Sequence, residues 1–296
     1  MFGELEEYLK DKHTKLEFPK SGMLRVGMAK MLGPQFCKRV YAVEGKSPTL
    51  TAASGGSMEP KYLTFNEGKP VWAKTEPHHW EMLQTVPVGY TGALSASKRH
   101  KVLGNGFTID VISHILGSAM FNEPINVLSL FDGISAAQIA LERAGIPVKN
   151  YYASEIDKYA ITVAQENYPN TQQIGDVRTV DVSTLPKIDL VVGGSPCQGF
   201  SFTGKGLNFA DPRSALFFEY VRILNETREI NPDVKFLLEN VRMKKEYQDV
   251  ISEHLGVQPV PINSSLVSAQ NRYRLYWANW EITQPDDRGI VLSDIV

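Results

Sequence analysis

The stretch Asn126–Gly133, which reads NVLSLFDG, indicates the fold of this chain more directly than any other. Its first five residues form a short apolar run typical of a buried strand, and its last three provide a glycine turn. Ala136–Ala144 follows with apolar residues at helical spacing and stops at Gly145. A strand, a turn and a helix in this order predict the first unit of a parallel α/β sheet.

The same alternation continues along the chain. Further strands are expected at Tyr151–Ser154, Asp189–Val192, Lys235–Leu238 and Arg274–Trp277, and further helices at Tyr159–Asn167, Leu216–Ile230 and Val250–Leu255. Because strands alternate with helices, we predict an α/β fold with a doubly wound, mostly parallel sheet. The first 105 residues are turn-rich and lack this alternation, and Phe107–Met120 then has the spacing of an amphipathic helix.

The composition narrows the class of protein. A chain of 296 residues with 43% hydrophobic content can bury a substantial core. Its two cysteines, Cys37 and Cys197, are far apart, which predicts neither a disulfide framework nor a metal site and fits a reducing compartment. The charged N-terminus and the lack of a run of roughly 18 apolar residues lead us to expect a soluble, cytoplasmic protein without membrane contact.

The formal net charge of −2 gives no global sign of nucleic-acid binding. Any DNA contact would therefore come from local basic clusters, of which Lys98–Lys101 is one. When the Lys98–Lys101 cluster is considered alone, a solvated charged surface without a nucleic-acid partner is the favoured interpretation.

Ligands of open α/β sheets bind beyond the carboxyl ends of the strands, and polar residues follow several predicted strands here. Gly133 is a single glycine, so the GxGxxG pattern is absent and a nicotinamide cofactor is disfavoured. Glu155 ends the second strand, roughly 20 residues after the first turn, where an acid commonly binds ribose hydroxyls. An acidic residue at a strand end has a purely structural role about as often as a ligand-binding one.

Cys197 lies in the loop GGSPCQGFS, residues 193–201, directly after the strand Asp189–Val192. A lone cysteine is more often a small buried hydrophobe, but this proline-flanked loop favours a nucleophile. Glu239 and Asn240 follow the next strand. Arg272 and Arg274 have strand alternation and are expected on one face, where an edge-strand ion pair is the alternative.

Together, SPCQGFS, ENV at 239–241 and QNRYR at 270–274, downstream of a strand that ends in FDG, resemble the DNA cytosine-5 methyltransferases. The resemblance is densest over 125–280. GDV at 175–177, the helix at 216–220 and SAQ at 268–270 are most similar to the animal de novo type. The resemblance to this family implies a Rossmann-like, S-adenosylmethionine-dependent methyltransferase with a small target-recognition lobe.

Two further segments resemble family motifs but precede the first strand. KSPTLT at 46–51 resembles the segment that organises the recognition region, and LGNGF at 103–107 resembles the motif that normally closes the chain. We therefore expect a circular permutation, with an unrelated N-terminal domain as the alternative. The expected parts are 1–45, in the recognition region; 46–124, the organising segment and closing helix; 125–280, the catalytic core; and 281–296, the start of the recognition region.

The resemblance implies a mechanism in which the base is flipped out of the duplex. The Cys197 thiolate would add to cytosine carbon 6, and a protonated Glu239 would bond ring nitrogen 3 and the exocyclic amine. Arg274, with Arg272 beside it, would contact the base carbonyl oxygen. Carbon 5 would then attack the methyl group. The substrate-binding set implied is Ser195, Gln198, Gly199, Ser201 and Asn240.

The same resemblance implies that S-adenosylmethionine, which leaves as S-adenosylhomocysteine, contacts ten residues. These are Phe131, Asp132, Gly133, Ile134, Glu155, Ile156, Asp176, Val177, Pro196 and Asn105. No metal is expected. Double-stranded DNA is the expected partner, in a bacterial or phage-infected cytosol or in a nucleus. The helix around Phe217 resembles a self-association surface, and a core-facing stripe explains it equally well.

Three other functions stay open from the sequence. A catalytically silent homologue would bind DNA as a regulatory subunit, although the retained Cys197, Glu239 and Arg274 argue against it. A tRNA cytosine-5 methyltransferase would keep the chemistry and change the acceptor. A nicotinamide oxidoreductase is disfavoured by the missing glycines.

Overall fold

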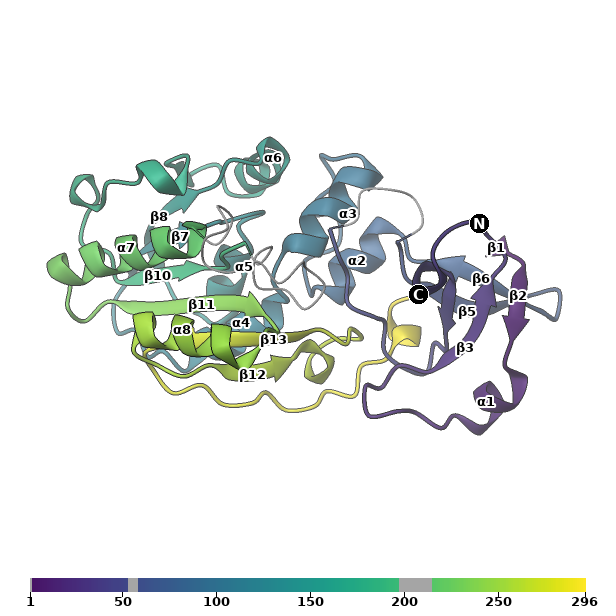
Figure 1. Ribbon diagram of the computed structural model, residues 1–296. Helices are drawn as coiled ribbons and strands as arrows, with labels where there is room; N and C mark the ends of the chain where they lie inside the picture. The colour runs from purple at the N-terminus through teal and green to yellow at the C-terminus, as the bar shows by residue number, and fades with distance from the viewer. Residues whose placement is uncertain (1, 53–57, 197–214) are drawn as a thin grey trace. The chain divides into compact units, whose positions relative to one another are not determined.

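The structure is a computed structural model that describes residues 2–52, 58–196 and 215–296. The chain forms two compact units (Figure 1). The first unit comprises Met1–Thr108, Asn263–Arg272 and Pro285–Val296, and the second comprises Ile109–Ile262 and Tyr273–Gln284. Within the described residues, no helix is long and apolar enough to cross a membrane.

Within the described residues, a seven-stranded sheet with the order β12-β13-β11-β10-β7-β8-β9 forms the centre of the second unit (Figure 1). Its strands are β7 (Ile125–Leu130), β8 (Val148–Ser154), β9 (Gln172–Gln173), β10 (Leu190–Gly193), β11 (Lys235–Val241), β12 (Val260–Asn263) and β13 (Tyr273–Ala278). The strands from β11 to β9 pair in parallel, and β13 is antiparallel to β11. The prediction of a doubly wound, mostly parallel α/β sheet is confirmed.

The helices of this unit are α4 (Ile109–Gly117), α5 (Ala136–Arg143), α6 (Lys158–Asn167), α7 (Ala215–Ile230) and α8 (Lys245–Leu255). All four residues of β10 are buried, as expected for a central parallel strand covered on both faces. Phe217 of α7 is fully buried in the core with Phe236 and Trp277. Its ring contacts Phe218 and His254, so the core-facing interpretation accounts for this residue.

Element types agree with the sequence prediction, while several boundaries differ. Helix α4 spans Ile109–Gly117 and is shorter at both ends than the predicted Phe107–Met120. After Gly117 the backbone tightens into turns, in which Ser118 N donates to Ile115 O and Ala119 N donates to Leu116 O. Helix α8 begins at Lys245, five residues before the apolar run that predicted it. Its first two residues, Lys245 and Glu246, are charged and exposed, so a hydrophobic pattern does not detect the start of this helix.

The first unit contains, in its described residues, a six-stranded sheet with the order β1-β6-β5-β4-β3-β2 (Figure 1). Its strands are β1 (Phe2–Gly3), β2 (Leu5–Tyr8), β3 (Arg25–Ala29), β4 (Arg39–Tyr41), β5 (Lys61–Asn66) and β6 (Lys69–Lys74). Successive strands β1 and β2 are at opposite ends of the order, with only Glu4 between them. The Glu4 carbonyl accepts from Lys30 N at 2.9 Å and from Trp72 Nε1 at 2.8 Å, so both ends of the sheet meet there. The sheet therefore curls back on itself.

In the described part of this unit, the sheet is accompanied by the helices α1 (Lys10–Lys15), α2 (Pro77–Leu83) and α3 (Ala96–Asn105). The C-terminal residues join the same unit, because Leu292 N donates to Gly45 O and Ser293 N donates to Val43 O. The two ends of the chain are therefore parts of one compact body. The domain boundaries inferred from the family resemblance stay a prediction.

Candidate active site

The turn after β7 has an unusual backbone. Phe131, Gly133 and Ser135 all have positive φ angles, of 57°, 62° and 58°. For the two residues that carry a Cβ, this left-handed conformation costs about 1 kcal/mol each. Strain of this kind persists only where surrounding contacts impose it, and it concentrates at functional sites.

Glu155, at the end of β8, holds this turn from the neighbouring strand. Its Oε2 accepts from Gly133 N at 2.8 Å, and its Oε1 accepts from Ile156 N and Asp157 N, also at 2.8 Å. A carboxylate offers about four acceptor positions, so one remains for a ligand. Ile156 is 71% exposed, which is unusual for an isoleucine at the end of a buried strand.

Asp132 is buried beneath the same turn. Its carboxylate accepts from Tyr151 Oη and from Ser135 Oγ, both at 2.6 Å. Burial raises the pKa of this carboxyl, and hydrogen bonds from hydroxyl groups partly offset that effect. The contacts of Asp132 therefore position the turn. Ile134 is also buried, at 2% exposed.

Asp176 follows β9, and its segment is tied to the end of β8 by a hydrogen bond of 2.8 Å from Ser154 Oγ to Gly175 O. Asp176 pairs with Arg178, whose hydrogen bond lowers the pKa of the carboxyl to about 2. It is therefore an ionised acceptor at neutral pH. Val177 beside it is buried at 5% exposed.

The ends of β10 and β11 are joined by side chains. Asn240 Nδ2 donates to Ser195 Oγ at 3.1 Å, and both residues are buried. Pro196, which follows Ser195, is half-buried. The loop continues into Cys197, Gln198, Gly199 and Ser201, which lie outside the described residues. Asn240 thus holds Ser195 at the end of β10.

Glu239 lies beside this link and pairs with Arg274 of β13. Arg274 Nε is 2.9 Å from Glu239 Oε1, and each side chain is 13% exposed. The Nε–H does not point along that line, so the contact is an ion pair without a hydrogen bond at this nitrogen. Arg274 Nη1 donates instead to Tyr273 O at 2.9 Å. The structure therefore brings together a half-buried acid and a guanidinium at the carboxyl end of β11.

Arg272 directly precedes β13, which begins at Tyr273, and its hydrogen-bond partners differ from those of Arg274. Arg272 is 3% exposed, and its guanidinium donates hydrogen bonds to backbone carbonyls of the first unit. Its Nη1 donates to Leu50 O at 2.9 Å, and its Nη2 donates to Gly106 O at 2.9 Å and Gly104 O at 3.3 Å. The contacts of Arg272 are those of a positioning residue for the segments around Leu50 and Gly104–Gly106.

The basic cluster Lys98–Lys101 is not an open cationic surface. Arg99 Nη2 is 2.9 Å from the carboxylate of Glu81, whose side chain is fully buried, and His100 is itself buried. Asn105 ends α3, and its side chain is exposed. Within the part of the chain that the structure describes, no group of three or more His, Cys, Asp and Glu side chains could hold a metal ion.

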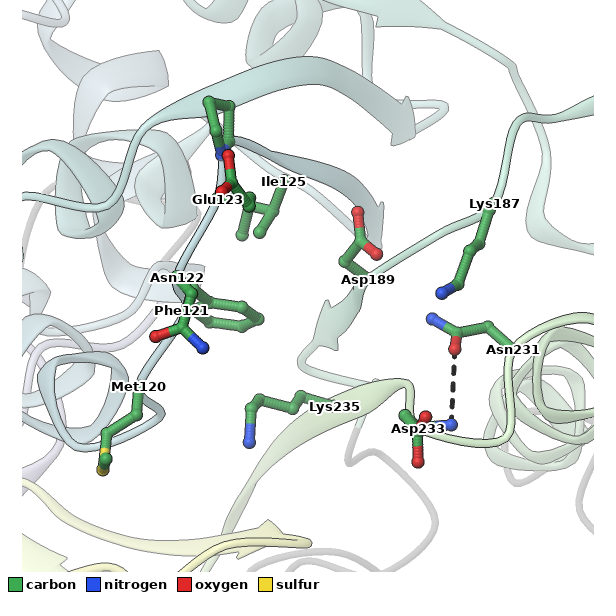
Figure 2. Close-up of a pocket in the computed structure, with 11 residues that line it drawn as sticks. Met120, Phe121, Asn122, Glu123, Ile125, Lys187, Asp189, Asn231, Asp233 and Lys235 are labelled. Atoms are coloured by element: carbon green, nitrogen blue, oxygen red, sulfur yellow. Dashed lines mark hydrogen bonds between the residues drawn. The ribbon is translucent and has the colours of Figure 1, made fainter.

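A cavity of about 230 Å³ lies at the opposite edge of the sheet, beside the amino ends of β7, β10 and β11 (Figure 2). Its polar side chains mostly serve the local backbone: Asp189 accepts from Asn126 N at 2.9 Å, and Asn231 Nδ2 donates to Ile188 O at 2.7 Å. Ligands of such sheets bind at the carboxyl ends, so this cavity is not the candidate active site.

Comparison with known proteins finds relatives that match about half of the chain. Residues 125–253 match the family model of C-5 cytosine-specific DNA methylases. The chain is 38% identical over 165 residues to the orphan methyltransferase M.SPRI of Bacillus phage SPR, covering 51% of this chain and 37% of that protein. It is 32% identical over 188 residues to the type II methyltransferase M.NlaX of Neisseria lactamica, covering 57% and 59%.

A plant relative also matches: DNA (cytosine-5)-methyltransferase DRM2 of Oryza sativa subsp. japonica is 33% identical over 179 residues, covering 54% of this chain and 30% of that protein. Among solved structures, a mutant of Spodoptera frugiperda DNMT2 aligns at 23% identity with a TM-score of 0.41, covering 55% of this chain and 53% of that one. The chain thus spans between about a third and three-fifths of the length of these relatives.

Proposed function

We propose that this chain, whose residues 125–253 match the family model of the C-5 cytosine-specific DNA methylases, transfers a methyl group from S-adenosylmethionine to carbon 5 of cytosine in double-stranded DNA. The observation that carries the proposal is the arrangement at the ends of β10 and β11. There the Ser195–Asn240 hydrogen bond and the Glu239–Arg274 ion pair lie at the carboxyl ends of neighbouring strands, and Cys197 follows Ser195 by two residues in the sequence.

The residues around the β7 turn fit the cofactor. Glu155 has acceptor capacity left for the ribose hydroxyls, exposed Ile156 offers an apolar surface to adenine, and ionised Asp176 can accept from the adenine amine. Phe131, Gly133 and Pro196 would complete the site from the β7 turn and the β10 loop, with Asn105 at the methionine end. When bound, S-adenosylmethionine supplies a methyl group activated on a sulfonium.

The protein groups would activate a base that has been turned out of the duplex. Addition of the Cys197 thiolate to carbon 6 makes carbon 5 nucleophilic enough to take the methyl group. Glu239 would hydrogen-bond ring nitrogen 3 and the exocyclic amine, and Arg274 would contact the carbonyl oxygen. Loss of the carbon 5 proton then expels the thiolate and restores the aromatic ring.

We also propose that the chain is circularly permuted relative to its family. The Lys46–Thr51 and Leu103–Phe107 segments, which resemble family motifs that follow the catalytic core, stand before it here. One bridge and three hydrogen bonds within the first unit support a common role for the separated segments. Ser47 forms a bridge with Gln270, and Arg272 donates to Leu50, Gly104 and Gly106.

The test is methyl transfer with a matched pair of cysteine variants. Purified protein is incubated with tritiated S-adenosylmethionine and mixed-sequence duplex DNA, and methylated cytosines are mapped by bisulfite sequencing. We expect Cys197→Ser to abolish transfer, while Cys37→Ser, in the other cysteine, keeps it. Label on tRNA instead of DNA would assign the RNA acceptor. Cofactor binding without label on either acceptor would favour a silent regulatory homologue.

A further inference from the structure

An arginine on α7 contacts the turn that carries Asp176, and the proposed methyl transfer gives this arginine no role. The turn is the short helix η2 (Val177–Thr179), and Asp176 is its capping residue. The guanidinium of Arg222 donates from Nη2 to Val177 O and from Nη1 to Val180 O, both at 3.2 Å. Arg222 therefore binds the backbone at both ends of η2.

Two carboxylates on the same helix fix the direction of the Arg222 side chain. Glu219 Oε2 accepts from Arg222 Nε at 2.9 Å, and Glu226 Oε1 accepts from Arg222 Nη1 at 2.9 Å. These acids lie one helical turn before and one turn after the arginine. A planar guanidinium can donate to both carboxylates and both carbonyls at once, whereas a lysine ammonium carries all its donors on a single nitrogen. The four contacts together therefore depend on the shape of arginine.

The segment around Asp176 is also held from β8. Ser154 Oγ of that strand donates to Gly175 O at 2.8 Å, directly before Asp176. The Asp176 side chain is 26% exposed, and its carboxylate accepts from Arg178 N, Nε and Nη2. A carboxylate offers about four acceptor positions, so one remains for a ligand. Asp176 thus stands between an anchor on β8 and an anchor on α7.

We propose that Arg222 is a positioning residue for the adenine end of the cofactor site, because it holds the turn from which Asp176 accepts from the adenine amine. This inference rests on the proposed function, which gives that contact to Asp176. The ribose contact belongs to Glu155, which is fixed by the backbone N–H groups of Gly133 and Ile156. Arg222 therefore acts on recognition of the adenine amine and does not itself touch the cofactor.

The test measures recognition of the adenine amine by calorimetry on the full chain. S-adenosylhomocysteine is compared with S-inosylhomocysteine, in which a carbonyl replaces the amine. The inosyl compound would set an acceptor against the Asp176 carboxylate, so we expect the wild type to bind it at least about tenfold more weakly. In Arg222→Lys the turn loses its anchor on α7, and the preference should fall to about threefold or less. A merely structural role for Arg222 would change the binding of both compounds equally and leave their ratio unchanged.

Arg228→Lys is the matched control, because Arg228 lies on the same helix and contacts other elements. Its Nη2 donates to Leu255 O at 3.4 Å, and its guanidinium lies over the Phe236 ring, 5.1 Å from the centroid. This variant should keep the preference of the wild type. Glu226→Gln removes the charge of one Arg222 partner and provides a second variant if Arg222→Lys fails to fold. It should lower the preference in the same direction.

Asp176→Asn separates failure of this inference from failure of the proposed function. We expect this variant to lose the preference for the adenosyl compound. If it does so while Arg222→Lys and Glu226→Gln keep the preference, or weaken both compounds equally, the positioning role of Arg222 is refuted and the adenine contact stands. If the wild type binds neither compound, or if Asp176→Asn keeps the preference, the cofactor contact in the proposed function is wrong and this inference is overturned with it.

Discussion

Replacement of Arg272 by methionine should destabilise the first unit strongly. The guanidinium is 3% exposed and donates to the carbonyls of Leu50, Gly104 and Gly106. Hydrogen bonds from a charged donor contribute roughly 1.5–3 kcal/mol each. Gly106 O still accepts a hydrogen bond from Gln84 Nε2 at 3.1 Å in the variant. The carbonyls of Leu50 and Gly104 are therefore the two that lose a hydrogen-bond donor. Methionine retains part of the apolar contact of the arginine stem, and we expect a net loss of about 3 kcal/mol in unfolding free energy.

The measurement is urea unfolding of Arg272→Met and of a matched surface variant, Arg39→Met. Arg39 is exposed, so its replacement should change the unfolding free energy by no more than about 0.5 kcal/mol. A loss below about 1 kcal/mol in Arg272→Met would refute the view that this arginine ties the segments around Leu50 and Gly104 together. A loss of methyl transfer without loss of stability would instead return Arg272 to the catalytic set.

Two further predictions concern the second unit. Tyr151→Phe removes the 2.6 Å hydrogen bond to buried Asp132 and should lower the unfolding free energy by about 2 kcal/mol. Tyr152→Phe, at the half-buried neighbour, should lower it by less than half of that. Equal losses in urea unfolding would contradict the role of the Tyr151–Asp132 hydrogen bond in stability. Asp176 has a folded-state pKa of about 2 against an ordinary value of 3.8, so its contribution is present above about pH 4 and is lost as the pH falls toward 2. In acid unfolding curves, the wild type should therefore lose slightly more stability than Asp176→Asn between about pH 4 and pH 2. The effect should be small because solvent screens the ion pair between Asp176 and Arg178. Parallel curves would show that this ion pair contributes nothing to stability.

The β5–β6 hairpin of the first unit has a local signal in the sequence. Glu67-Gly68 stands between two runs of strand-forming residues, and both residues adopt positive φ, of 50° and 73°. That pair is the signature of a tight hairpin turn whose twist matches its strands. The curled sheet around it has no comparable local signal, because β4 pairs in parallel with β5 across the long segment between them.

The sequence by itself determined the α/β sheet, its carboxyl-end acids and the similarity of residues 125–253 to the C-5 cytosine-specific DNA methylases. Those properties depend on local periodicity and on short motifs whose residues are adjacent in the chain, such as the apolar run of β7 and its glycine turn. Tertiary structure alone decided what each polar group contacts. Asp132, which was expected to contact the cofactor, is buried and accepts a hydrogen bond from Tyr151. Arg272 donates to backbone carbonyls of residues that are more than 160 positions away in the chain. His100 belongs to a basic tetrapeptide, and yet it lines a cavity. Hydrogen-bond partners of buried groups depend on long-range packing, which no spacing within one segment encodes.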